Sequence, residues 1–360
     1  MIAVHPSRDV KFINTDVRRT KKLLVGVGCS FTQGTSSYDL ELIADKPPIE
    51  VDYIYGYQGY DLATKQYIAK TYKDITLTGT DLNTHNHQFN NSYINILAQK
   101  YLKSEWTPIN FGLEGSGNTG SINRLMMYPI DWNHADEIVV IYMPTGLARF
   151  DIVNDAYHNL WEIGCDHATM WPHSEEVINS LNSNKAMAKN QGAGNNAWNL
   201  MQLGYFKSIW SKKFEVKKAI LEFQILKNWC SMHNAKLLVF PAFNPEYTRQ
   251  LFAHNLKNHI ERNLQTRDII IDEETKFFDA DLIEHLVSSV PWDRFVKIKK
   301  CSTFSELALL HEPTIENKHE YYRPEPKVPT PNLWLMGCGH PGKKAHDLLA
   351  RELVPHIRAL

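Results

Sequence analysis

The chain has 360 residues, of which 43% are hydrophobic and 22% are charged, and its formal net charge is −1. This composition is typical of a globular chain. The near-neutral charge excludes nucleic acid and an anionic membrane as main partners, because both are bound by strongly basic surfaces. The five scattered cysteines contain no Cys-x-x-Cys pair, so they indicate neither a disulfide framework nor a structural zinc site.

No apolar run reaches the length of a membrane span, and the first twenty residues lack the apolar centre of a signal peptide. We therefore expect a cytoplasmic protein, or one exported by another route such as assembly into a larger particle. The composition gives no reason to expect a metal or a cofactor, and it leaves the oligomeric state open.

The first predicted strand covers residues 21–25, after an irregular lead-in over 1–20. It runs into a turn of small residues over 26–34, which contains Ser30. Open α/β sheets bind their ligands at such turns, at the carboxyl ends of strands. The turn fits neither a P-loop nor a dinucleotide fingerprint, because no Gly-Lys-Ser/Thr follows and the glycines are wrongly spaced. Ser30 is then either an exposed nucleophile or a hydroxyl in a glycine-rich connector.

Residues 36–90 form a polar, Tyr-rich segment that is predicted to be an insertion. Within it, His85 and His87 lie near Asp81. The pattern favours a solvated loop over a metal site, because His-x-His alone is a weak signal. After the insertion, apolar residues at helical spacing predict a helix over 93–102.

A short strand is predicted over 106–111, followed by a second glycine-rich turn over 112–118 and a helix over 121–127. The clearest strand of the chain is 135–142, which is continuous, apolar and rich in β-branched residues. It ends in a third turn over 143–146. Strands that alternate with helices in this way predict a parallel sheet.

The remaining chain continues this pattern with two long interruptions. Residues 151–205 are predicted to be an insertion of unassigned fold, and residues 247–331 a further insertion that contains helical stretches and a proline-rich end. Between them, the pattern predicts a long amphipathic helix over 206–230 and a buried strand over 236–240.

The chain ends in a predicted helix with apolar residues at 345, 348, 349, 353 and 357. His340 lies in the loop before this helix, as a catalytic group or as a capping or core histidine, and His346 is predicted to face solvent. We expect one α/β domain over 1–360, a flavodoxin-like three-layer sandwich with a mostly parallel central sheet. Its predicted core comprises 20–35, 91–150, 206–246 and 332–360.

The turns and the terminal His-Pro pair resemble the sequence blocks of the SGNH (GDSL-like) hydrolase family. The first block of that family, Gly-Asp-Ser-x-x-x-Gly, is similar to residues 28–34, with Cys29 in place of the Asp. The second block, Asn-x-Gly-x-x-Gly, is similar to residues 110–115. The last block, Asp-x-x-His-Pro before a helix, is similar at His340 and Pro341.

This resemblance implies a three-layer α/β fold and an ester hydrolase without a cofactor. It implies that Ser30 is the nucleophile, that His340 is its general base, and that the N–H groups of Ser30 and Gly115 hold the oxyanion. Asn118 or Thr145 is the expected further donor. The substrate class is an O-acyl or O-acetyl ester of a carbohydrate, a lipid or a small molecule.

Two positions depart from the family pattern. Thr145 stands where the third block has Asn, and residues 337 and 338 are Gly and Cys where an Asp is expected before the His. These departures keep two other functions open: a catalytically inactive module that binds a glycan or serves a structural role, and an O-acyltransferase that uses the same Ser and His. For Asn118 and Thr145, a hydrogen bond within a turn or cap is an equally good interpretation.

Overall fold

The computed structural model describes the core of the chain and short parts of its insertions. The described residues are 2–3, 21–34, 37, 59–61, 66–68, 90–103, 105–112, 116–127, 131–147, 149–153, 167–170, 211–243, 246–265, 273–311 and 340–360. The expectations for residues 81–87, for Gly115 and for the 337–338 pair therefore lie outside the described residues.

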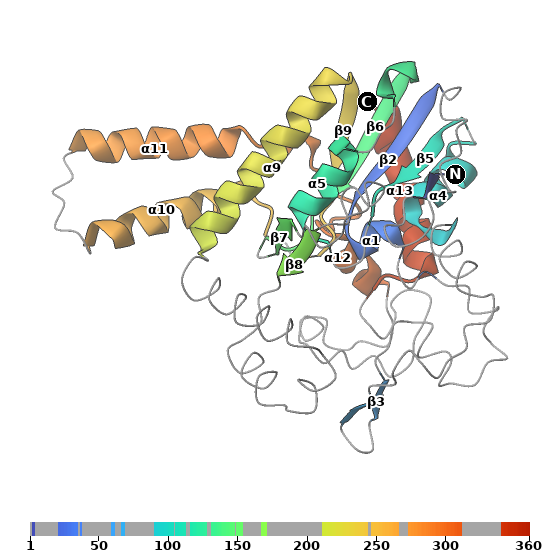
Figure 1. Ribbon diagram of the computed structural model, residues 1–360, viewed down its shortest axis with the longest axis horizontal. Helices are drawn as coiled ribbons and strands as arrows, with labels where there is room; N and C mark the ends of the chain where they lie inside the picture. The colour runs from blue at the N-terminus through green and yellow to red at the C-terminus, as the bar shows by residue number, and fades with distance from the viewer. Residues whose placement is uncertain are drawn as a thin grey trace.

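A parallel β-sheet forms the centre of the molecule (Figure 1). Across the sheet, its four main strands are β5 (Thr107–Asn110), β2 (Lys22–Gly28), β6 (Glu137–Met143) and β9 (Ala235–Val239). The two-residue β1 (Ile2–Ala3) pairs with the outer edge of β5, and Phe295 adds one parallel bridge beside β9. The four main strands are those predicted from the sequence, and they confirm the α/β fold class, whereas β1 lies in the lead-in that was expected to be irregular.

The strand order of the sheet reverses between β2 and β6, and Ser30 lies beside this point. Numbered along the chain, the four main strands lie in the order 2-1-3-4, so the chain winds in opposite directions from β2 and from β6. The register pairs Gly28 with Met143, which brings the carboxyl ends of β2 and β6 side by side. Ligands of doubly wound sheets bind in the crevice at this point.

Helices cover both faces of the sheet (Figure 1). One face carries α4 (Tyr93–Ile96) with its π-helical continuation η4 (Leu97–Tyr101), α12 (Phe304–Leu310) and α13 (Lys343–Arg358). The other carries α5 (Asn118–Met127), α9 (Lys212–Met232) and the start of α10 (Arg249–Gln265). The result is the three-layer sandwich expected from the sequence.

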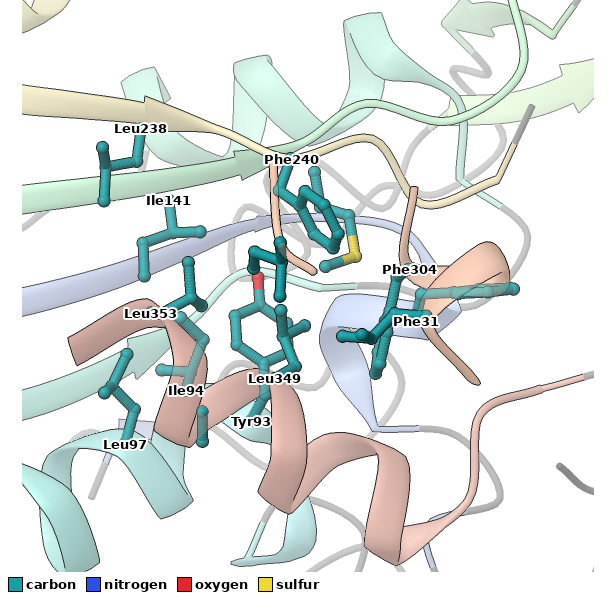
Figure 2. Close-up of a cluster of buried hydrophobic side chains, with 14 of the residues drawn as sticks. Phe31, Tyr93, Ile94, Leu97, Ile141, Leu238, Phe240, Phe304, Leu349 and Leu353 are labelled. Atoms are coloured by element: carbon teal, nitrogen blue, oxygen red, sulfur yellow. The ribbon is translucent and has the colours of Figure 1, made fainter. Parts of the chain in front are cut away.

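Alternating side chains of the strands feed the two hydrophobic layers, because successive residues of a strand point to opposite faces. Ile141 and Leu238 point to the α13 side, where Figure 2 shows Ile94, Leu349 and Leu353 packed against them. These residues are 0–4% exposed, and full burial of one such side chain contributes about 1.5–3 kcal/mol. The apolar runs of the sequence therefore become buried strands.

Part of the 247–331 segment belongs to these layers. Phe252 and Val287 are buried on the α9 side, and Phe304 is buried on the α13 side. Phe304 begins α12, whose first turn is closed by a capping box between Thr303 and Glu306. The ends of α10 and α11 (Glu273–Ser288) project from the sheet as a helical hairpin (Figure 1). The sequence analysis assigned this whole segment to an insertion and did not predict its share of the core.

Two short hairpins lie outside the central sheet. β3 (Gly59–Asp61) pairs with β4 (Gln66–Ile68) within the 36–90 segment, and β7 (Phe150–Val153) pairs with β8 (His167–Met170) near the start of the 151–205 segment. Across the described residues, no helix combines the length and the apolar character that a bilayer crossing requires.

Candidate active site

Ser30 and His340 meet at the carboxyl edge of the sheet. Ser30 is the first residue of the short α1 (Ser30–Gln33), which follows β2, and His340 lies just before α13. The Ser30 Oγ and His340 Nε2 atoms are 2.8 Å apart, although 310 positions separate the two residues in the chain. This distance is typical of a hydrogen bond, and it is the geometry that a nucleophile and its general base require.

A tight turn holds Ser30 at this edge, where the residue is only 4% exposed, so the expectation of an exposed serine is wrong. The N–H groups of Thr32 and Gln33 both donate to the Cys29 carbonyl, and the turn ends at Gly34 with φ of 88°, a conformation that favours glycine. Gly28 is needed for a different reason. A Cβ atom there would lie 2.3 Å from the Thr32 Oγ1 atom and 2.8 Å from the Met143 carbonyl oxygen.

Asn110 joins the first turn to the second. Its side-chain Nδ2 donates to the Thr32 carbonyl over 2.8 Å, and its Oδ1 accepts from the Gly112 N–H over 2.9 Å. The two turns approach so closely that a Cβ atom on Gly112 would lie 2.2 Å from the Gln33 nitrogen. Both polar ends of the Asn110 amide are therefore engaged in fixing the backbone beside Ser30.

Asn118 is engaged at both ends of its amide, which favours the interpretation as a hydrogen bond within the turns over the role of oxyanion donor. Its Oδ1 accepts from the Thr145 N–H over 2.8 Å, and its Nδ2 donates to the Tyr247 hydroxyl over 2.9 Å. The Tyr247 hydroxyl in turn donates to the Thr145 carbonyl. Asn118 is 2% exposed, so its amide fixes the third turn from behind.

Thr145 itself stays a candidate donor. Its side chain is 1% exposed, and among the described residues none forms a hydrogen bond with its hydroxyl. Most buried polar groups in proteins are hydrogen-bonded, so an unpartnered hydroxyl at a strand end is a candidate contact for a ligand.

Two charged residues that the sequence analysis missed hold the second turn. Arg124 is 1% exposed and donates to the carbonyls of Phe111 and Gly28, at 3.0 and 3.2 Å. Asp151 accepts from the N–H groups of Gly117 and Gly120 at the start of α5, at 2.9 and 2.7 Å. A carboxylate at this position also interacts favourably with the partial positive charge of the helix amino end. The sequence signal for Arg124 was its position as the only charged residue between 121 and 127.

His346 is buried beneath the pair, so the expectation that it faces solvent is wrong. It is fully buried, its Nδ1 accepts from the Tyr93 N–H over 3.2 Å, and its ring stacks on that of Tyr93 with an interplanar angle of 9°. The Phe304 ring meets that of His346 edge to face, at 4.9 Å between ring centroids. Burial, and then the nearby His340 ring, lower the pKa of His346 to about 3, so this imidazole is neutral at physiological pH.

The low pKa of His346 predicts acid sensitivity. In the unfolded chain this group binds a proton near the ordinary histidine pKa of 6.5, whereas in the folded chain it does so only near 3. The unfolded state thus binds more protons between these values, and stability falls as pH drops below 6.5, by up to about 1.4 kcal/mol per pH unit. We expect His346→Asn, which keeps an acceptor for the Tyr93 N–H, to reduce this slope in urea unfolding at pH 7, 6 and 5. Equal slopes for the two chains would contradict the prediction.

Comparison with known proteins found no matching family model, no matching curated protein and no matching solved structure. The resemblance to SGNH hydrolases therefore stays a prediction from the sequence blocks. In the described part of the chain, no group of three or more His, Cys, Asp or Glu side chains is placed to hold a metal ion.

Proposed function

We propose that the chain is a serine ester hydrolase of the SGNH-like type, with Ser30 as the nucleophile and His340 as the general base. The observation that carries this proposal is the 2.8 Å contact between the Ser30 hydroxyl oxygen and the His340 Nε2 atom. It joins the two most specific sequence blocks, from opposite ends of the chain, at the edge where doubly wound sheets bind ligands.

The chemistry runs in two halves. Ser30 Oγ attacks the ester carbonyl while His340 Nε2 takes its proton, and the tetrahedral intermediate collapses to an acyl-enzyme as His340 returns the proton to the leaving alkoxide. A water molecule, activated by the same imidazole, then releases the acid. His346 stays neutral, so its ring does not repel the positive charge that forms on His340 during the reaction.

The oxyanion needs donors aimed at the carbonyl oxygen. The proposed donors are the N–H of Ser30, the hydroxyl of Thr145 and the N–H of Gly115. Support for Thr145 comes from its buried hydroxyl, which has no hydrogen-bond partner among the described residues, and support for Gly115 comes from the sequence block alone. Asn118 is not among them, because its amide holds the Thr145 backbone.

The first test is hydrolysis of a short-chain aryl ester beside labelling with a fluorophosphonate probe, which reacts with activated serines. We expect turnover and a single labelled residue in the wild-type chain, with both lost in Ser30→Ala. Ser305→Ala, which removes another buried hydroxyl from a helix of the same core, is the control that should retain both. Ester turnover that survives in Ser30→Ala would refute the site.

The absence of a carboxyl side chain at positions 337 and 338 favours a second candidate, a module that keeps the fold and binds a glycan without cleaving it. An O-acyltransferase with the same Ser and His is the third. The probe separates them: no labelling and no turnover favours the binding module. The transferase is favoured if the probe labels the chain, if added sugar alcohol speeds the loss of ester, and if an acylated sugar is the product.

A further inference from the structure

Arg149 follows the third turn and reaches back toward the second. Its Nη1 donates to the Ser116 carbonyl over 3.0 Å, and its backbone N–H donates to the Gly146 carbonyl over 3.2 Å. The guanidinium carbon lies 4.9 Å from the centre of the Phe243 ring, within the range of a cation–π contact. Arg149 is only 8% exposed, so this cation is held inside the carboxyl edge of the sheet.

The same guanidinium is close to the first turn. It interacts electrostatically with the side chain of Cys29, the residue before Ser30. Two aromatic rings also lie between the Arg149 guanidinium and His340, the proposed general base. Phe243 lies 5.3 Å from Phe31, and Phe31 lies 5.3 Å from His340, between ring centroids. The side chain of Arg149 therefore lies where the three strand-end turns converge.

The charge balance favours an anion at this point. Arg149 and the buried Arg124 both point into the turns. Of the buried carboxylates near them, Asp151 accepts from two backbone N–H groups at the start of α5, and Glu222 is paired with Lys218. Burial lowers the pKa of the Arg149 guanidinium, with Cys29 and Asp151 acting against that shift, and an arginine stays charged even so. A fixed charge with little water around it acts strongly on a nearby developing charge.

We propose that Arg149 supplies the charge stabilisation that the Asn of the third block supplies in the family that this chain resembles: its guanidinium stabilises the oxyanion formed when Ser30 attacks the ester. This inference rests on the proposed hydrolase function. It assigns the missing donor to a residue four positions after Thr145, so that Thr145 and Arg149 act from the same loop.

The test compares Arg149→Met and Arg149→Lys with the wild-type chain on a neutral aryl ester. Removal of an oxyanion donor typically lowers kcat by about 10²–10³-fold, so we expect that loss in Arg149→Met with little change in KM. Arg149→Lys keeps the charge without the planar fork, and we expect an intermediate kcat. An alkylboronic acid, which forms a tetrahedral adduct with the serine, should lose affinity in proportion to kcat/KM across the series.

Lys236→Met is the control, because it removes a cation that binds Glu137 at the amino end of β6, away from the turns. Its kcat should fall far less. An equal loss in Lys236→Met, an unchanged kcat in Arg149→Met, or a loss confined to esters with a carboxylate and expressed in KM would each overturn the inference. A wild-type chain with neither turnover nor probe labelling would instead refute the hydrolase function itself.

Discussion

His340→Ala should lower kcat for ester hydrolysis by about 10⁴-fold or more, because Ser30 would lose the base that lies at hydrogen-bond distance. Fluorophosphonate labelling of Ser30 should fall in parallel, since the hydroxyl is a weak nucleophile while it keeps its proton. His340 is partly exposed, so added imidazole should enter the space left by the ring and restore part of the rate. The measurement is steady-state turnover with and without millimolar imidazole.

His134→Ala is the control for this prediction. His134 is half-exposed and lies before β6, at the end of the sheet opposite Ser30. Its loss should leave turnover within a factor of two, and thermal unfolding should show that both variants are folded. A folded His340→Ala chain that turns over within tenfold of the wild-type rate would contradict a catalytic role for His340.

The sheet could be predicted because its signals are local. The runs over 135–142 and 236–240 are apolar for most of their length, which is typical of strands buried on both faces. Glycine-rich turns mark where β2, β5 and β6 end. The side chains that join these turns could not be predicted in this way, because the bonds of Arg124 and Asp151 depend on which turns the fold brings together.

The expectation for His346 is wrong, and the contacts of Asn118 favour one of its two interpretations, both for physical reasons. The motif spacing identified Asn118 as a polar residue near Ser30, but spacing does not say whether an amide faces a ligand or a backbone group. His346 precedes Leu349 by three positions and Leu353 by seven, which places it on the apolar stripe of α13. The residue type suggested a solvent-facing side chain, and the helical period was the better guide.

Arg124→Met should cause the largest loss of stability among the substitutions considered. The Arg124 side chain has 1% exposure and forms hydrogen bonds with the carbonyls of Gly28 and Phe111 and with the hydroxyls of Ser116 and Ser121. Removing one partner from a buried, charged network typically costs about 3–5 kcal/mol. Urea unfolding of the two chains at one pH measures this loss.

The same substitution should also slow ester hydrolysis, because Arg124 holds the Gly28 carbonyl two residues before Ser30. Arg124→Lys separates charge from geometry: an ammonium keeps the charge but cannot serve both carbonyls as the planar fork does, so we expect most of the stability loss to persist. Arg351→Met, on the exposed side of α13, should change stability by no more than about 0.5 kcal/mol. A free energy of unfolding for Arg124→Met within about 1 kcal/mol of the wild-type value would contradict this prediction. The turns around Ser30 would then be held by their backbone hydrogen bonds and by Asn110, without need of the buried guanidinium.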